Sequence, residues 1–221
     1  MTLSGGTGAW LAIVGLGWYH GINPGMGWLF AVSNGMQERR GLAVFTALPP
    51  IALGHWLAMA VILLPVALLT AYVQQIRSLR LLAAALLIGF GVYKLVNRRH
   101  PRVLARIGSG RLILWSFLMA TAHGAGLMLV PVYLAVSAGS DPGVNHATMP
   151  LMAAEGIATA SLMALVHTVA MLLTGGLLAW VVYRYLGLKL LQRVWFNFDL
   201  LWAGSLIVVG ALALIATTLS S

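Results

Sequence analysis

The sequence has no cysteine and very few charged residues. The 221-residue chain has 13 Lys and Arg residues but only 4 Asp and Glu residues, and 61% of it is hydrophobic. The missing cysteines exclude thiol redox chemistry, cysteine-ligated iron–sulfur clusters and disulfide bonds. About a quarter of the residues in a soluble domain are charged, whereas only 8% are charged here. We therefore expect an integral membrane protein whose main partner is the lipid bilayer.

Six apolar runs are long enough to cross a bilayer, which takes about 20 mostly apolar residues. The sequence therefore predicts an all-α polytopic membrane protein with six transmembrane helices. Pro49 and Pro50 stand near the start of the second run and are expected to begin or kink its helix, because proline lacks a backbone N–H. The predicted spans are Trp10–Met36, Ala43–Val73, Leu79–Asn97, Arg111–Ala138, Gly156–Arg184 and Trp195–Leu219.

The basic residues between the predicted spans are distributed unequally. Of the 13 Lys and Arg residues, 11 follow spans one, three and five, and 2 lie between spans two and three. The positive-inside rule assigns the richer side to the cytoplasm, so we expect both termini on the external, periplasmic side. Topology thus accounts for the net charge of +9, and no nucleic-acid partner is expected because no basic recognition element is present.

The first three predicted spans resemble the last three. Residues 52–59 (ALGHWLAM) and 164–171 (ALVHTVAM) agree at five of eight positions, including a histidine and a methionine. His20 and His123, each followed by glycine, stand at matching places in spans one and four, and spans three and six align more weakly. Because three is odd, the second copy must cross the bilayer in the opposite direction. The predicted parts are repeat 1 (1–97), a basic cytoplasmic connector (98–110) and repeat 2 (111–221).

A chain of two inverted three-helix repeats resembles the superfamily that includes lysine exporters, nickel–cobalt efflux proteins and sulfite-exporter-like permeases. The resemblance covers the whole chain as a pattern of helices and repeats. It implies a secondary permease whose site lies near the bilayer midplane, between the repeats. The acidic, His-rich motif of the nickel–cobalt proteins is absent, so no functional residue is assigned from the resemblance.

Four histidines lie near the middle of their predicted spans: His20, His55, His123 and His167. Each is about 10 to 15 residues from the ends of its span, hence about 15–20 Å deep at 1.5 Å per residue. An ionisable residue inside the membrane usually marks a functional site, although a neutral histidine can also form a structural hydrogen bond between helices. Four at one depth, in two repeat-related pairs, favour a shared site for substrate or metal.

Methionines accompany these histidines. Met59 and Met171 each follow a histidine by four residues and share its helix face. Imidazole with thioether is a soft ligand set that suits copper best; the alternative is that methionine fills gaps in the core. The segment Gly15–Gly27 includes Asn23 and a proline, so we expect a broken helix whose free backbone groups and Asn23 side chain can bind substrate.

Several functions are compatible with these features. The leading interpretation is a secondary transporter of a small substrate or transition-metal ion, in which the histidines bind substrate or relay protons. The alternatives are an electron carrier with b-type haems, an intramembrane His-ligated metalloenzyme, and a structural subunit of a membrane complex or homo-oligomer. Two haems would need histidines at two depths, so transport is favoured over electron transfer. No serine-protease pattern is present, and the metalloenzyme and the structural subunit stay open as interpretations beside transport.

The charge asymmetry predicts that a reporter active only in the cytoplasm stays silent at either terminus. The physical reason is that the basic loops are retained in the cytoplasm, which leaves both ends outside. The measurement is reporter activity in cells, with insertion after Arg40, in a predicted cytoplasmic loop, as the positive control. Activity at either terminus contradicts the assignment.

Overall fold

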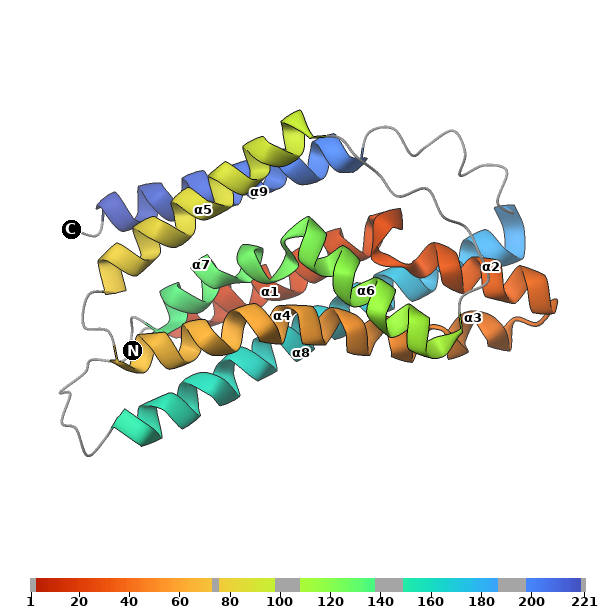
Figure 1. Ribbon diagram of the computed structural model, residues 1–221, viewed down its shortest axis with the longest axis horizontal. Helices are drawn as coiled ribbons and strands as arrows, with labels where there is room; N and C mark the ends of the chain where they lie inside the picture. Colours follow the sequence, from red (N-terminus) through yellow and green to blue (C-terminus); the bar gives the residue numbers. More distant parts are fainter. Residues whose placement is uncertain (1–2, 73–75, 98–107, 138–148, 187–197, 220–221) are drawn as a thin grey trace.

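The described part of the chain is helical, with no strand (Figure 1). The computed structural model describes residues 3–72, 76–97, 108–137, 149–186 and 198–219. This confirms the predicted all-α class. It is also the fold that lipid favours, because a helix satisfies its backbone hydrogen bonds within one segment. Most of the predicted basic connector 98–110 lies outside the described residues.

Among the described residues, four helices are long and apolar enough to cross a membrane, as an integral membrane protein requires. A fifth span results if the bent pair Gly110–His123 and Ala125–Ser137 is one crossing. The first predicted span, Trp10–Met36, is not among the four helices, and its residues are divided between two helices. The four helices cover Leu42–Tyr72, Arg77–Val96, Met149–Leu186 and Leu200–Leu219.

The long helices follow the predicted apolar runs, with two differences. The second run is a short helix α3 (Leu42–Thr46) joined to α4 (Leu48–Tyr72), and its two prolines fall in the first turn of α4, where no backbone N–H is needed. The predicted start of the fifth span at Gly156 is wrong, because α8 already begins at Met149, in a stretch of good helix formers. The bounds are α5 Ile76–Val96, α8 Met149–Val181 with a π-helical extension η2 Val182–Leu186, and α9 Phe198–Leu219.

The first predicted span is broken, as expected, but the break begins only after Ile22 and does not include the whole predicted segment Gly15–Gly27. Helix α1 (Leu3–Ile22) runs straight through the glycines before His20. The break follows as a 3₁₀ turn, η1 (Pro24–Met26), and Gly27 with a φ of 103° starts α2 (Trp28–Glu38). Gly17 has a different role, because a Cβ at this position would lie 2.6 Å from a backbone oxygen of α8. Gly17 allows close helix packing and does not break the helix.

The fourth predicted span, Arg111–Ala138, is also two helices. Helix α6 (Ser109–His123) ends at Gly124, and α7 (Ala125–Ser137) continues at a bend of 62°. Gly124 has a φ of 74°, a conformation that glycine adopts without strain. The breaks in the first and fourth predicted spans therefore both follow the matching histidines.

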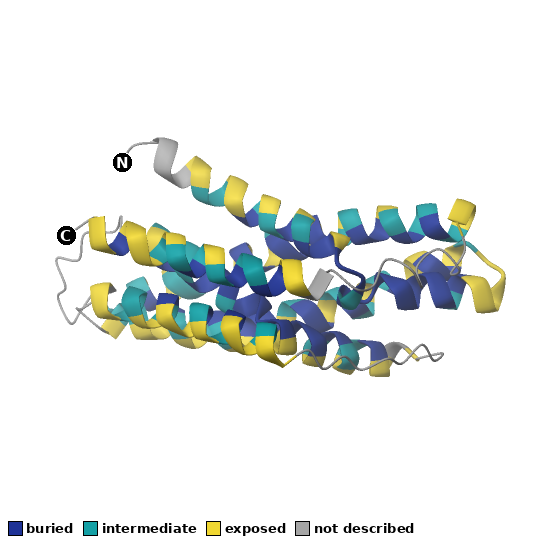
Figure 2. Ribbon diagram, turned by 90° about the horizontal axis from the view of Figure 1, so that it is seen from above, coloured by how far each residue is buried: buried dark blue, intermediate teal, exposed yellow. Residues whose placement is uncertain are grey.

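The helices form two groups. Helices α5 and α9 lie side by side as a pair (Figure 1), and this pair packs against α7 of the bundle made by α1, α4, α6, α7 and α8. Buried residues line the centre where the helices meet, and exposed residues cover the outer faces (Figure 2). Those outer faces remain apolar: Leu11 and Leu173 are each 67% exposed. Such faces suit a lipid solvent.

The interface between α5 and α9 is reciprocal. A Cβ at Gly91 would lie 2.7 Å from Cγ1 of Ile207 and 3.0 Å from a backbone oxygen of α9. A Cβ at Gly210 would lie 2.7 Å from Cγ1 of Ile88 and 3.1 Å from a backbone oxygen of α5. Gly91 and Gly210 are also the positions that match when the sequences of the third and sixth predicted spans are aligned, as are Ile88 and Ile207. Each helix thus offers the other the same surface, as two copies related by a two-fold axis do.

Valine at Gly91 or Gly210 is expected to destabilise the protein, by about 1–3 kcal/mol for an overpacked interface. Valine at Gly89 or Gly204, on the same two helices, is the matched control, because a Cβ there meets nothing within 4 Å. Thermal unfolding in detergent measures the difference. Equal losses at the contact and control positions would contradict the reciprocal packing.

Candidate functional site

Three of the predicted histidines form a buried cluster. His20, His55 and His167 are at most 1% exposed, and one ring nitrogen from each lies within 4.8 Å of the other two. The ring centroids are 4.9 Å apart for His20–His55, 5.3 Å for His20–His167 and 5.8 Å for His55–His167. The rings of His55 and His167 are nearly parallel at 7°, and His20 stands edge-on to both.

The three histidines come from three helices, and glycines bring two of these, α1 and α8, close together. Gly17 places α1 against the backbone of α8 beside His167, and a Cβ at Gly21 would meet the backbone oxygen of Met171 on the same helix. In lipid, helices associate chiefly through this kind of close packing at small residues. The cluster therefore depends on backbone approach that a larger side chain would prevent.

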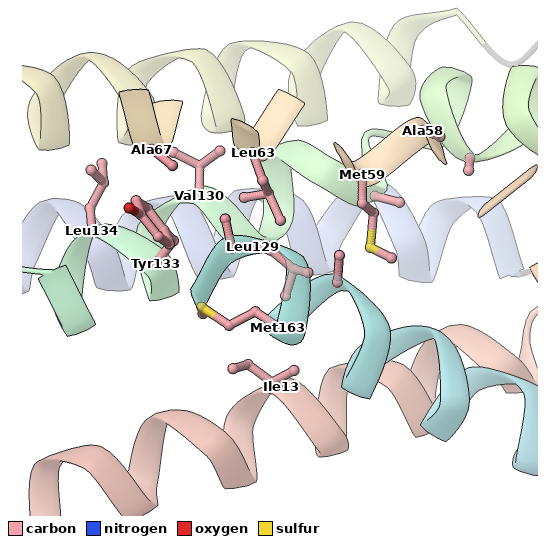
Figure 3. Close-up of a cluster of buried hydrophobic side chains, with 14 residues drawn as sticks. Ile13, Ala58, Met59, Leu63, Ala67, Leu129, Val130, Tyr133, Leu134 and Met163 are labelled. Carbon is pink, nitrogen blue, oxygen red and sulfur yellow. The ribbon is translucent and has the colours of Figure 1, made fainter. Parts of the chain in front are cut away.

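Two apolar layers lie on either side of the cluster along α4 and α8. Met59 and Met163, each one helical turn from a histidine, belong to one buried cluster (Figure 3). Ile51 and Met171, one turn away in the opposite direction, belong to a second buried cluster. This pairing shows that α4 and α8 run antiparallel and cross at the histidines. Each predicted methionine ligand is thus a core residue of one layer, and its role as a ligand stays a prediction.

Most ring nitrogens of the cluster have no hydrogen-bond partner in the described part of the chain. Among the described residues, both nitrogens of His20 and Nε2 of His55 are buried without a hydrogen-bond partner. Those of His167 make no hydrogen bond of normal geometry either, although one lies near the backbone of Ile13. A buried polar group without a partner costs about 1–3 kcal/mol. Hydrogen bonding between helices therefore does not explain this cluster, whereas a bound ligand would.

His123 is a neighbour of the cluster and not one of its three members. Its Nδ1 lies 2.8 Å from the carbonyl oxygen of Met119 and donates to it, because a carbonyl only accepts. Trp202 of α9 contacts both histidines, with ring centroids 4.3 Å from His20 and 6.3 Å from His123. The indole Nε1 also donates to the carbonyl oxygen of His123 at 2.7 Å. The sequence predicted one site of four histidines. In the structure, three of them form the cluster, and the fourth, His123, lies beside Trp202.

Asn23 lies at the first break, where it has a structural role. It is 5% exposed, its Oδ1 accepts a hydrogen bond from the backbone N–H of Gly25 at 2.9 Å, and its Nδ2 is buried without a partner among the described residues. A Cβ at Gly25 would lie 3.4 Å from Nε2 of His123. The break in the first span therefore packs against the histidine that precedes the second break.

The sequence analysis missed Trp202. This side chain is 1% exposed and stacks on Tyr19 at 5.6 Å, besides its contacts with the histidines. Tryptophan in a membrane helix usually lies at the interface with water. The available signal was its place in the apolar run of α9, as the fifth residue of that helix, where a buried polar N–H needs a partner.

Comparison of the chain with protein-family models, with curated proteins and with solved structures gives no match to any of them. The resemblance to lysine exporters and related permeases therefore remains one of helix pattern. What the site can do follows from its own chemistry: three adjacent imidazoles in an apolar interior can coordinate a metal ion or hold a small polar substrate.

Replacing Trp202 with phenylalanine is expected to lower the free energy of unfolding by about 1 kcal/mol, because the carbonyl of His123 loses its donor. Trp18→Phe is the matched control, since Trp18 is on α1 and 55% exposed. Thermal unfolding in detergent measures both variants. A loss in the control as large as in Trp202→Phe would contradict a specific role for this hydrogen bond.

Proposed function

We propose that this protein is a secondary transporter that carries a transition-metal ion, copper(I) in particular, through the His20–His55–His167 cluster. The observation that carries the proposal is the meeting of three buried imidazoles from three helices, with ring nitrogens that lack hydrogen-bond partners among the described residues. Burying unpaired imidazole nitrogens in a membrane interior costs free energy, and a bound cation would offset that cost.

The ligand set favours a soft cation of low charge. Imidazole nitrogens bind metal at about 2.0–2.1 Å, so a metal shared by three of them holds the nitrogens roughly 3.5 Å apart. The nitrogens lie within 4.8 Å of one another, a spacing that small side-chain rotations can close. The cluster contains histidine alone. Without a carboxylate, a divalent ion would leave two charges uncompensated, which disfavours zinc and nickel relative to copper(I).

The inverted repeat of six spans that we propose would support transport through this site. In that arrangement the broken pairs α1–α2 and α6–α7 would be the first and fourth spans, and their breaks follow matching histidines. The crossing of α4 and α8 at His55 and His167 and the reciprocal contact of α5 with α9 fit one pseudo-two-fold axis. Alternating access would open the two apolar layers in turn, with both termini external.

The alternatives fit the site less well. A haem needs a flat slot between axial histidines, whereas these rings are in direct contact and Trp202 packs on His20. A metalloenzyme could bind its metal through three histidines with an open fourth position, but its substrate would need access to that position, and all three histidines are at most 1% exposed. A purely structural subunit gives no reason to keep unpaired nitrogens in the core.

Copper(I) binding tests the proposal directly. The purified protein is expected to bind one copper(I) per chain under reducing conditions, and to carry it into proteoliposomes. His20→Ala, His55→Ala and His167→Ala should each weaken binding at least tenfold, because each removes one ligand. Titration with a competing chelator measures the affinity, and thermal unfolding confirms that the variants fold.

The matched control is Thr168→Val. Thr168 is buried beside His167, but its hydroxyl donates to Ala164 of its own helix at 2.8 Å. It should leave copper binding unchanged. Wild-type binding that survives in all three histidine variants, or no copper binding by folded wild-type protein, contradicts the proposed substrate.

A further inference from the structure

A second feature lies away from the histidines, between α1, α7 and α9. It is a cavity of about 640 Å³, large enough for a small-molecule ligand. Most of its lining is small or aliphatic, and Arg80 of α5 is the one charged residue among the described lining residues. The walls include Ala12 and Gly15 of α1, Ala135 of α7, and Val209, Ala213 and Thr217 of α9.

Arg80 is held with spare hydrogen-bonding capacity. Its Nη2 donates to the carbonyl oxygen of Leu134 on α7 at 3.0 Å. Its Nε is buried and has no hydrogen-bond partner among the described residues. A guanidinium carries five N–H donors in a planar fork that matches a phosphate or carboxylate. The apolar cavity therefore has one cationic donor group that an anion can satisfy.

The cavity has the length of one lipid leaflet. Arg80 lies near the start of α5 and Thr217 near the end of α9, at the end of the molecule where both termini lie (Figure 1). From Thr217 to Val209 the lining extends about 12 Å at 1.5 Å per residue. It reaches Leu16, one turn before His20. Half of a hydrocarbon core of about 30 Å is about 15 Å, so the cavity runs from the surface to near the midplane.

The cavity is also open sideways. Leu212 lines it and is nevertheless 61% exposed on α9. In a membrane this exposure is to lipid, so an acyl chain can enter the cavity from the bilayer. A soluble anion would match Arg80 but not the apolar walls. A second copy of the chain would match the walls but would bring no evident anion to Arg80.

We propose that this cavity binds an anionic phospholipid, with its phosphate at Arg80 and one acyl chain between α1, α7 and α9. The ligand would fill the space beside α9, the helix that carries Trp202. It would thereby brace the α5–α9 pair against the rest of the bundle. This site shares no residue with the proposed metal site, so either proposal can fail alone.

Thermal unfolding of the delipidated protein with defined lipids tests the site. Dioleoyl phosphatidylglycerol is expected to raise the midpoint by about 3 °C or more above dioleoyl phosphatidylcholine. Arg80→Gln should abolish that difference, because the variant loses the cation. Arg77→Gln should keep it, since Arg77 is exposed one turn earlier on the same helix.

Gly15→Leu tests the acyl-chain part. A Cβ at Gly15 meets nothing within 4 Å, so the larger side chain should fill the cavity without a clash. It is expected to remove stabilisation by both lipids, and mass spectrometry of wild-type protein should detect retained phosphatidylglycerol. Three results would overturn the proposal: equal effects of the two lipids on wild type, a lipid preference that survives in Arg80→Gln, or full stabilisation by inorganic phosphate alone.

Discussion

Contact between helix backbones at glycine is the interaction on which the rest of this structure depends. Lipid offers no hydrophobic drive to bring apolar helices together, so they associate through close packing. Gly17 brings α1 onto α8, Gly54 brings α4 onto α6, and Gly91 with Gly210 joins α5 to α9. The first of these contacts sets the spacing at which the imidazoles from α1 and α8 can touch. The chemistry of the cluster is therefore a result of small residues elsewhere.

Trp202 connects the two groups of helices. The α5–α9 pair packs on the main bundle through a buried cluster that includes Leu87, Met128, Trp202 and Leu206. Within this cluster the indole of Trp202 stacks on Tyr19, contacts His20 and donates to the carbonyl of His123. That carbonyl belongs to the last residue of α6, next to the bend at Gly124. A displacement of α9 would thus change contacts both at a cluster histidine and at a broken helix.

Much of this arrangement could be predicted from the sequence, because it depends on the apolar composition of the runs and on the repeated segments. The apolar runs predicted α4, α5 and α9 closely, and the repeated octapeptide indicated that His55 and His167 belong together. The separation of His123 from the cluster could not be predicted, because it depends on an indole from a distant helix. The early start of α8 was missed because Pro150 and Gly156, residues that often break helices, lie in its first turns. The packing role of Gly17 was missed because close helix packing and helix breaking use the same residue type.

The reciprocal contact of α5 with α9 has a consequence for how such a chain can arise. A surface that fits its own copy in the opposite direction would let a three-helix chain pair with itself, provided that some molecules insert one way and some the other. Such dual insertion requires loops without a charge bias. In the inverted repeat that we propose, fusion of the two copies in one chain would let each half acquire its own bias, and the 11-to-2 distribution of Lys and Arg over the predicted loops is what such a fused pair would be free to evolve. Fusion also frees each half to diverge, so that a tryptophan in one half need not have a counterpart in the other.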